Sequence, residues 1–475
     1  MKIRTSILCI LSATGFLWNG AAEQPRPNVL MIAVDDLRPE LACYGADQIH
    51  SPHIDALAAE GLLFERAYCQ IAVCGASRAS LLSGTRPETT TIWDYKTPMR
   101  SRLPDVLSLP QHLKANGYRT IALGKVYHVA TDDFPQGWSE RPWRPRAPTY
   151  VTETALDQRV RLEDRVRGPS VEDGGRIGDD VYADGVTAAE AARRLQELSE
   201  ASEPFLLAVG FLKPHLPFVA PGRFWDLYDR DAIEIPDRAD PVNSPLYARS
   251  SWGELRNYSD VQASGDLDDA QTRELIHGYY ASVSYTDHNI GVVLKALEDA
   301  GLKDNTIVIL WSDHGWYLGE YGDWCKHTND EVAARVPMIL RVPGQEPGLR
   351  TTALTELVDV YPTLCDLLDL PVPDHCQGHS FAPLVDDPSQ PWKEVAFSQY
   401  HKSRFRGTSL RSARYRYTEW RDRRTGELDS IELYDLVADP GQTVSVHEDG
   451  KHAAILQRMA TLAPRSNSGV APAIR

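Results

Sequence analysis

The chain has 475 residues and a formal net charge of −16 at pH 7, and 24% of its residues are charged while 42% are hydrophobic. These proportions are typical of a globular protein, and the length favours one large domain with a smaller one. No block of Lys and Arg stands out, which excludes nucleic acid as the main partner, so a pocket for an anionic ligand must gather its basic side chains locally.

The first 22 residues have the features of a secretory signal peptide. Lys2 and Arg4 form a basic start, an apolar run too short to span a bilayer follows, and small residues up to Ala22 provide a cleavage site. No other stretch is apolar over the length of a membrane span. We therefore expect export to the periplasm or the exterior, and a mature protein without a membrane span. The lone N-glycosylation sequon, at Asn257, favours a bacterial periplasm over a lysosome.

Buried strands alternate with helices up to about residue 370. Apolar runs predict strands within residues 28–36, 118–125, 204–215, 306–315 and 336–344. Amphipathic patterns predict helices within residues 51–64, 108–117, 182–199, 269–301 and 357–370. Gly61 ends the first helix, and the long fourth helix is expected to break near its middle. The alternation predicts an α/β fold with a large, mostly parallel sheet flanked by helices.

The pattern changes after about Pro371. Short alternating runs predict an antiparallel sheet with strands within residues 396–400, 408–420 and 432–436. We expect a signal peptide, a large domain and a smaller C-terminal α+β domain over residues 1–22, 23–380 and 381–475. The segment from Trp138 to Gly178 is rich in Arg, Pro and Gly and is expected to form a long loop, either near the functional site or mobile.

Polar side chains follow four of the predicted strands. Ligands of open α/β sheets bind beyond the carboxyl ends of the strands. These ends carry Asp35 and Asp36, Lys125 and His128, Lys213 and His215, and Asp313 and His314. Solvated loop tips would explain one such end, but four together predict a functional site at this edge of the sheet.

The acidic residues that follow these strands are suited to bind a metal ion. Asp35, Asp36 and Asp313 supply hard oxygen ligands of the kind that Ca²⁺ or Mg²⁺ prefers, and three carboxylates without a cation would repel one another. His314 is a less typical ligand for calcium and leaves manganese or zinc open.

The basic residues that follow these strands are suited to bind an anionic substrate and to transfer protons. Histidine side chains ordinarily titrate near neutral pH, which suits His128 and His215 to carry protons. Lys125, Lys213 and Lys326 are positioned in the sequence to offset the charge of an anionic group.

Cys74 lies in the stretch AVCGASRASLLSGTRP, before a predicted helical run from Arg78 to Ser83. A helix N-terminus lowers the pKa of a thiol, so a thiolate nucleophile with a histidine base is one interpretation. A soft thiolate matches hard carboxylates poorly, and a buried structural cysteine is the interpretation that so short a pattern favours on its own. Elsewhere, Cys365 and Cys376 could close a short loop, although the sequence does not establish that pairing.

Six segments, in order, resemble motifs of one family. CGASR at residues 74–78 resembles the sulfatase signature C-x-[PA]-x-R, and SLLSGTRP resembles its continuation. The other similar segments are VDDLRPELACYG, GKVYH, VGFLKPHLPF, SDHGWYLGEYGDWCKHTN and ELYDLVADP. The chain is identified on these residues as a member of the type I, formylglycine-dependent sulfatase family, in its iduronate-2-sulfatase-like subgroup. The resemblance implies an alkaline-phosphatase-like sulfatase fold, with the catalytic domain over residues 23–380.

The resemblance implies one Ca²⁺ bound by Asp35, Asp36, Asp313 and His314, the last in a position that is Asn in many sulfatases. It also implies that a formylglycine-generating enzyme oxidises Cys74 to Cα-formylglycine during maturation. Hydration of this aldehyde gives a geminal diol, of which one oxygen binds Ca²⁺ and the other attacks sulfur. The side chain at position 74 would then no longer carry a thiol. Its hard oxygen would match the hard cation.

Further roles follow from the same resemblance. Arg78 and Lys125 would hold the charge of the diol and the sulfate, and Asp313 would accept the proton of the nucleophile. His215 or Lys326 would protonate the leaving sugar oxygen.

Three more residues complete the expected site. His128 would take a proton from the second hydroxyl, so that sulfate leaves and the aldehyde is regenerated. Lys213 and Trp316 are expected near the substrate, the latter lining a sugar pocket.

The expected activity is hydrolysis of a sulfate ester on a sulfated oligosaccharide or polysaccharide, with the 2-O-sulfate of a uronic acid as the target. One alternative is a phosphate or phosphonate ester hydrolase of the same superfamily. Another is a catalytically inactive sugar-binding protein, against which stands the presence of every catalytic-type residue.

Overall fold

The computed structural model describes residues 26–162 and 165–464. The predicted signal peptide over residues 1–22 lies outside this part of the chain. No helix in the described ranges combines the length and the apolar character needed to cross a membrane.

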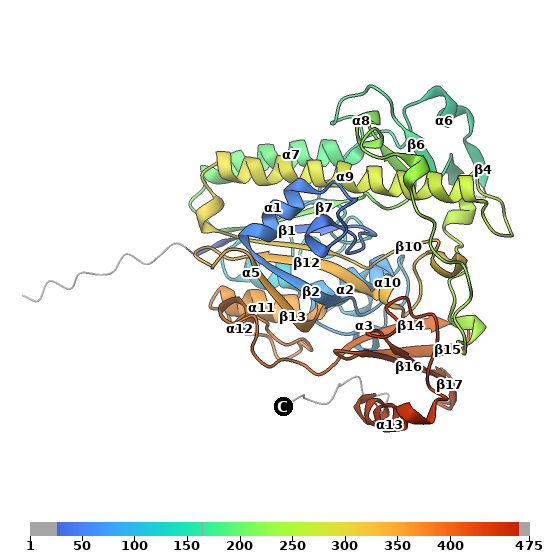
Figure 1. The fold of residues 1–475 in the computed structure, drawn as a ribbon. Coiled ribbons are helices and arrows are strands. Elements are labelled where there is room, and N and C mark those ends of the chain that lie inside the picture. The colour runs from blue at the N-terminus through green and yellow to red at the C-terminus, as the bar shows by residue number, and fades with distance from the viewer. Residues whose placement is uncertain (1–25, 163–164, 465–475) are drawn as a thin grey trace, which may run out of the picture.

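A seven-stranded sheet forms the centre of the molecule (Figure 1). Its strands, in spatial order, are β13 (Leu349–Glu356), β2 (Leu62–Tyr68), β12 (Arg335–Arg341), β9 (Thr306–Ser312), β1 (Asn28–Val34), β7 (Phe205–Phe211) and β3 (Arg119–Gly124). In this sheet β12 runs against both neighbours, and the other six strands share one direction. The predicted α/β class with a mostly parallel sheet is therefore confirmed.

Helices cover both faces of this sheet, because its central strands are apolar on both sides. In β1, Val29 and Met31 face one core while Leu30 and Ile32 face the other, as the two-residue period of a strand requires. The core around Leu30 is covered by α1 (Pro52–Glu60), α7 (Ala183–Ser199) and α9 (Asp269–Asp299) (Figure 1). The core around Met31 is covered by α2 (Cys74–Ser83), α5 (Leu109–Ala115) and α11 (Val360–Leu367).

One prediction about a single helix was wrong. Helix α9 runs unbroken over 31 residues, and Gly278 within it serves close packing, since a Cβ there would lie 3.0 Å from Phe218, Trp225 and Val171. The prediction that Gly61 ends the first helix is confirmed, because α1 ends at Glu60 and the residues from Leu62 belong to β2.

The C-terminal part forms the predicted antiparallel sheet. Its strands are β14 (Ala396–Lys402), β15 (Phe405–Arg411), β16 (Tyr415–Asp422) and β17 (Leu428–Asp435), and α13 (Ala453–Leu462) packs against them through Met459. The boundary between residues 380 and 381 stays a prediction. Cys365 and Cys376 are free thiols, so no disulfide closes the loop between them.

Short elements occupy the connections. The helices are α3 (Pro87–Thr90), α4 (Met99–Arg102), α6 (Glu153–Asp157), α8 (Gly222–Trp225), α10 (Glu331–Ala334) and α12 (Pro383–Asp386). Three two-stranded ladders pair β4 (Val160–Leu162) with β5 (Arg165–Arg167), β6 (Val171–Asp173) with β8 (Phe218–Ala220), and β10 (Tyr317–Leu318) with β11 (Trp324–Cys325). The segment from Trp138 to Gly178 is therefore not the single long loop that was expected, since it contains α6, β4, β5 and β6.

Candidate functional site

The carboxyl ends of two neighbouring strands bring the acidic residues together. β1 and β9 are parallel and in register from Asn28 opposite Thr306 to Val34 opposite Ser312. The residues that follow, Asp35 on one strand and Asp313 on the other, are wholly buried.

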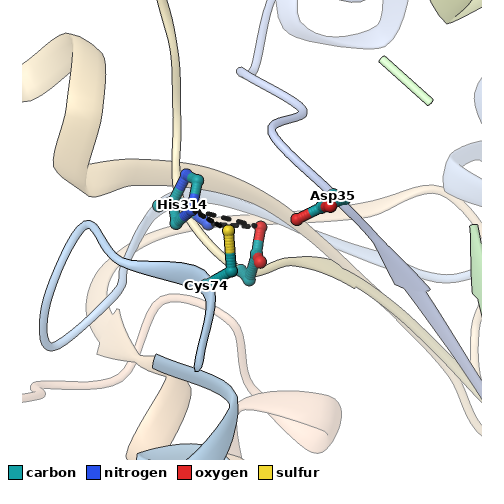
Figure 2. Close-up of side chains that lie close together, drawn as sticks. Asp35, Cys74 and His314 are labelled. Atoms are coloured by element: carbon teal, nitrogen blue, oxygen red, sulfur yellow. Dashed lines mark hydrogen bonds and ion pairs between the residues drawn. The ribbon is translucent and has the colours of Figure 1, made fainter. Parts of the chain in front are cut away.

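Helix α2 adds Cys74 to this edge of the sheet. The ligand-type atoms of Asp35, Cys74, Asp313 and His314 all lie within 4.8 Å of one another. Figure 2 shows Asp35, Cys74 and His314 pointing toward a common centre. The side chains of this Asp/Cys/His cluster come from three separate segments and meet only in the folded chain.

His314 and Asp36 complete the donor set. Nδ1 of His314 lies 3.0 Å from the Gly315 carbonyl, which leaves Nε2 facing the cluster, 3.3 Å from Sγ of Cys74. Asp36 has a left-handed backbone with φ of 61°, and its N–H donates to Oδ1 of Asp313 at 3.2 Å. This turn ends the strand and allows two consecutive carboxylates to serve one site, where an extended strand would point them to opposite faces.

Basic side chains surround the carboxylates. Arg78, wholly buried, places Nε 2.8 Å from Oδ2 of Asp313 and Nη2 3.3 Å from Oδ1 of Asp35. Nζ of Lys125 donates to Oδ2 of Asp35. Burial opposes the charged form of Asp35, but Lys125, His215 and Arg78 outweigh it and hold the pKa of this carboxyl well below its usual range. Asp35 therefore stays ionised.

The structure does not favour a thiolate at Cys74. The side chain is 4% exposed, and burial together with the Asp35 carboxylate raises the pKa of the thiol well above its usual value. These effects outweigh the helix N-terminus at which Cys74 sits. Its place in the cluster equally disfavours a purely structural cysteine.

A second group of charges joins the two candidate proton donors. Nζ of Lys326 lies 2.8 Å from Oδ1 of Asp36 and 3.0 Å from Oε2 of Glu254. Nε2 of His215 lies 2.9 Å from Oε1 of the same glutamate. Burial opposes ionisation of Glu254, but Lys326 and His215 hold its pKa well below the usual range. Glu254 thus bridges both donors, and sequence reasoning missed it because it lies in an irregular segment without a motif.

We expect Glu254→Gln to lower kcat by about 10- to 100-fold with little change in KM, because Lys326 and His215 lose the carboxylate that orients them. Steady-state kinetics measures both parameters, and Glu254→Asp should recover part of the loss. Glu320→Gln is the matched control, since Glu320 is similarly exposed and bonds Arg38 at 2.6 Å. Equal kcat values for the two glutamine variants would contradict a positioning role.

His128 lies three residues after Lys125 in the loop that follows β3 and is partly exposed. Burial and the charge of Lys125 lower its pKa to about 3, and its Nδ1 is buried without a hydrogen-bond partner in the described residues. The ring is therefore neutral at physiological pH and able to accept a proton.

Lys213 and Trp316 are not placed as residues that line an open sugar pocket would be. Nζ of Lys213 donates to the carbonyls of His215 and Pro217, each at 2.6 Å, so it holds the turn that carries His215. Trp316 is wholly buried, and its ring lies 4.9 Å from Nζ of Lys326. A direct role of either residue in substrate binding stays a prediction, which this burial does not favour.

Known proteins resemble this chain over most of its length. The family model described as Sulfatase matches residues 27–370, and the one described as N-sulphoglucosamine sulphohydrolase, C-terminal, matches residues 319–466. The iduronate 2-sulfatase of Mus musculus is 34% identical over 91% of this chain and 93% of that protein.

Two solved structures share the fold. A 2-O GAG sulfatase has a TM-score of 0.71 at 24% identity, covering 92% of this chain and 91% of that chain. The phosphonate monoester hydrolase of Agrobacterium radiobacter has a TM-score of 0.72 at 22% identity, covering 92% of this chain and 94% of that chain. At these identities the likeness concerns the fold alone, and it confirms the architecture expected from the sequence.

Proposed function

The chain belongs to the sulfatase family of hydrolases, and on that premise we propose that it removes a sulfate ester from a sulfated carbohydrate, the 2-O-sulfate of a uronic acid. The observation that carries the proposal is the buried cluster of Asp35, Cys74, Asp313 and His314 with Arg78 and Lys125 against it. The relative named iduronate 2-sulfatase, similar over nearly the whole chain, supports the choice of sugar.

The donor set fits one Ca²⁺. Carboxylates of Asp35 and Asp313 converge with His314, whose Nδ1 lies by the Gly315 carbonyl, as is common for metal-binding histidines. Asp36 groups with Cys74 and His215, and its Oδ1 lies 3.4 Å from Nδ1 of His314, so it would join the ion from the other side of Cys74. These residues would hold the ion, which supplies positive charge to a sulfate group bound beside it.

Residue 74 is proposed to act as Cα-formylglycine, which supplies, when hydrated, an oxygen nucleophile in place of the thiol. Arg78 and Lys125, both buried, would orient the sulfate oxygens and stabilise their charge. Asp313, whose Oδ2 bonds Arg78, would accept the proton of the nucleophile.

The leaving sugar oxygen would receive a proton from the Glu254-bound pair, His215 or Lys326. His128, neutral and without a partner at Nδ1 among the described residues, would accept the proton that is released when the sulfate departs. Export by residues 1–22, to a periplasm or the exterior, is part of this proposal and matches a substrate found outside the cell.

The test is sulfate release by protein co-expressed with a formylglycine-generating enzyme. Two oligosaccharides that differ only in sulfate position are compared, one with 2-O-sulfate on a terminal iduronate and one with 6-O-sulfate on a glucosamine. We expect release from the first alone. Release from the second alone would refute the uronate assignment, and faster turnover of a matched phosphate or phosphonate ester would favour the alternative hydrolase activity.

A further inference from the structure

The polypeptide next to the site is anchored to the edge of the main sheet at Trp143. Its N–H donates to the Ala122 carbonyl and its carbonyl accepts from the N–H of Gly124, both at 2.9 Å, beside Leu123 of β3. β3 is the outermost strand on that side of the sheet. This pairing places the next residue, Arg144, at the carboxyl end of β3. Lys125 and His128 follow the same end of that strand.

The guanidinium of Arg144 is bound at one end only. Nη2 donates to the carbonyl of Tyr127 at 2.6 Å and to that of His128 at 3.1 Å. Nε is buried without a hydrogen-bond partner, and within residues 26–162 and 165–464 no carboxylate lies within 4.0 Å of this side chain. In the part of the chain that the structure describes, Arg144 is therefore a largely buried cation without a carboxylate partner.

Other buried arginines of the chain are paired. Arg86 binds Glu356 with two nitrogens at 2.7 and 2.9 Å, and Arg78 binds two carboxylates. Burial and the charge of Arg78 lower the pKa of Arg144 to about 10, with Asp35 opposing, so the side chain still carries its charge at neutral pH. An unpaired buried charge is costly, and its retention at a site indicates a ligand that supplies the missing anion.

We propose that Arg144 binds a second oxyanion of the substrate, distinct from the sulfate ester that is hydrolysed. The planar guanidinium matches a carboxylate or a sulfate through paired hydrogen bonds. Arg144 bonds the backbone carbonyls of Tyr127 and His128, and among the described residues no hydrogen bond or ion pair joins it to the side chains of the Asp/Cys/His cluster. A group held by Arg144 would therefore be another substituent of the sugar. This inference rests on the proposed function and adds to it the residue that binds the second anionic group of the substrate.

The experiment compares Arg144→Gln with the unchanged enzyme on substrates that differ in one anionic group. The first pair is a 2-O-sulfated uronate disaccharide and its carboxyl-reduced counterpart, and the second pair differs by one additional sulfate. A simple aryl sulfate, which has no second anion, is the reference. We expect kcat/KM to fall about 10- to 100-fold, mainly through KM, only on substrates that carry the group bound by Arg144. A loss that follows the carboxylate identifies a uronate, and a loss that follows the extra sulfate identifies a second sulfate.

Two further variants distinguish the effect of the Arg144 charge from a structural effect of the substitution. Arg144→Lys keeps the charge and should recover part of the loss. Arg146→Gln makes the same change at an exposed position two residues away and should leave all rates near those of the unchanged enzyme. An equal loss by Arg144→Gln on every substrate, the aryl sulfate included, would overturn the inference, because Arg144 would then act by holding the His128 turn.

A binding measurement keeps this test separate from that of the proposed function. Calorimetry with the desulfated uronate disaccharide and its reduced counterpart needs no turnover. A third ligand is the reduced disaccharide that carries the additional sulfate. The unchanged protein should bind the acid or this sulfated alcohol more tightly than the plain alcohol, and Arg144→Gln should remove that difference. Equal binding of all three ligands, or a difference that persists in Arg144→Gln, would overturn the inference whether or not the enzyme hydrolyses sulfate esters.

Discussion

Replacement of Cys74 by alanine is expected to abolish sulfate-ester hydrolysis, with a fall in kcat of about 10⁴-fold or more, the scale of loss when a covalent nucleophile is removed. Sulfate release by the purified variant measures the loss of activity, and its thermal unfolding shows whether the fold persists. The fold should persist, because Cys74 lies at the start of α2 and alanine fills most of its volume.

Cys69→Ala is the matched control for this variant. Cys69 is also buried, in the core around Met31, and its Sγ lies 3.9 Å from the Ala333 carbonyl. Its loss should cost stability of the same order as the loss of Cys74 and leave kcat nearly unchanged. Retained turnover by the Cys74 variant would exclude the formylglycine mechanism.

The double replacement Asp35→Asn with Asp36→Asn is expected to remove Ca²⁺ and to lower kcat by about 10³-fold or more, because a bound cation supplies several kcal/mol of charge stabilisation. Elemental analysis of the purified protein measures the calcium content. The same change leaves Lys125 unpaired in the interior and leaves Lys326 with Glu254 as its remaining partner, at about 3–5 kcal/mol for each broken pair. Wild-type protein treated with a chelator and then resupplied with Ca²⁺ therefore tests the metal without that cost.

Asp132→Asn with Asp133→Asn serves as the control for this pair. These two aspartates are also consecutive and buried, but Asp132 accepts from the Met99 N–H and Asp133 binds Arg100, away from the cluster. The control should lose stability and keep its calcium. Calcium content that is unchanged in the Asp35 and Asp36 variant would refute the metal assignment.

The sequence predicts the centre of the sheet well, because strands buried on both faces are apolar without interruption. The run NVLMIAV defines β1, and the acids that follow it stand out against that run. The sequence does not reveal β2 or β13. β2 begins one residue after the helix-ending Gly61, so its apolar start continues the helical pattern, and β13 is a half-exposed edge strand with weak alternation.

The catalytic-type residues could be found because each follows a strand or belongs to a family motif. Glu254 and Arg144 could not, since both lie in irregular segments and owe their positions to long-range contacts. Glu254 reaches the site through Lys326 and His215, and Arg144 through the pairing of Trp143 with the end of β3. Neither contact has a local periodicity that a sequence pattern could record.

The burial of Cys74 has a consequence for the order of events during biosynthesis. In the finished fold this side chain is 4% exposed and lies against His314, which comes 240 positions later in the chain. If Cys74 is converted to formylglycine, as proposed, the converting enzyme would need access before this later segment covers the side chain. Maturation and folding would then compete in time, and a chain that folds first would keep its thiol. Slower folding or more of the converting enzyme would therefore raise the active fraction of a preparation.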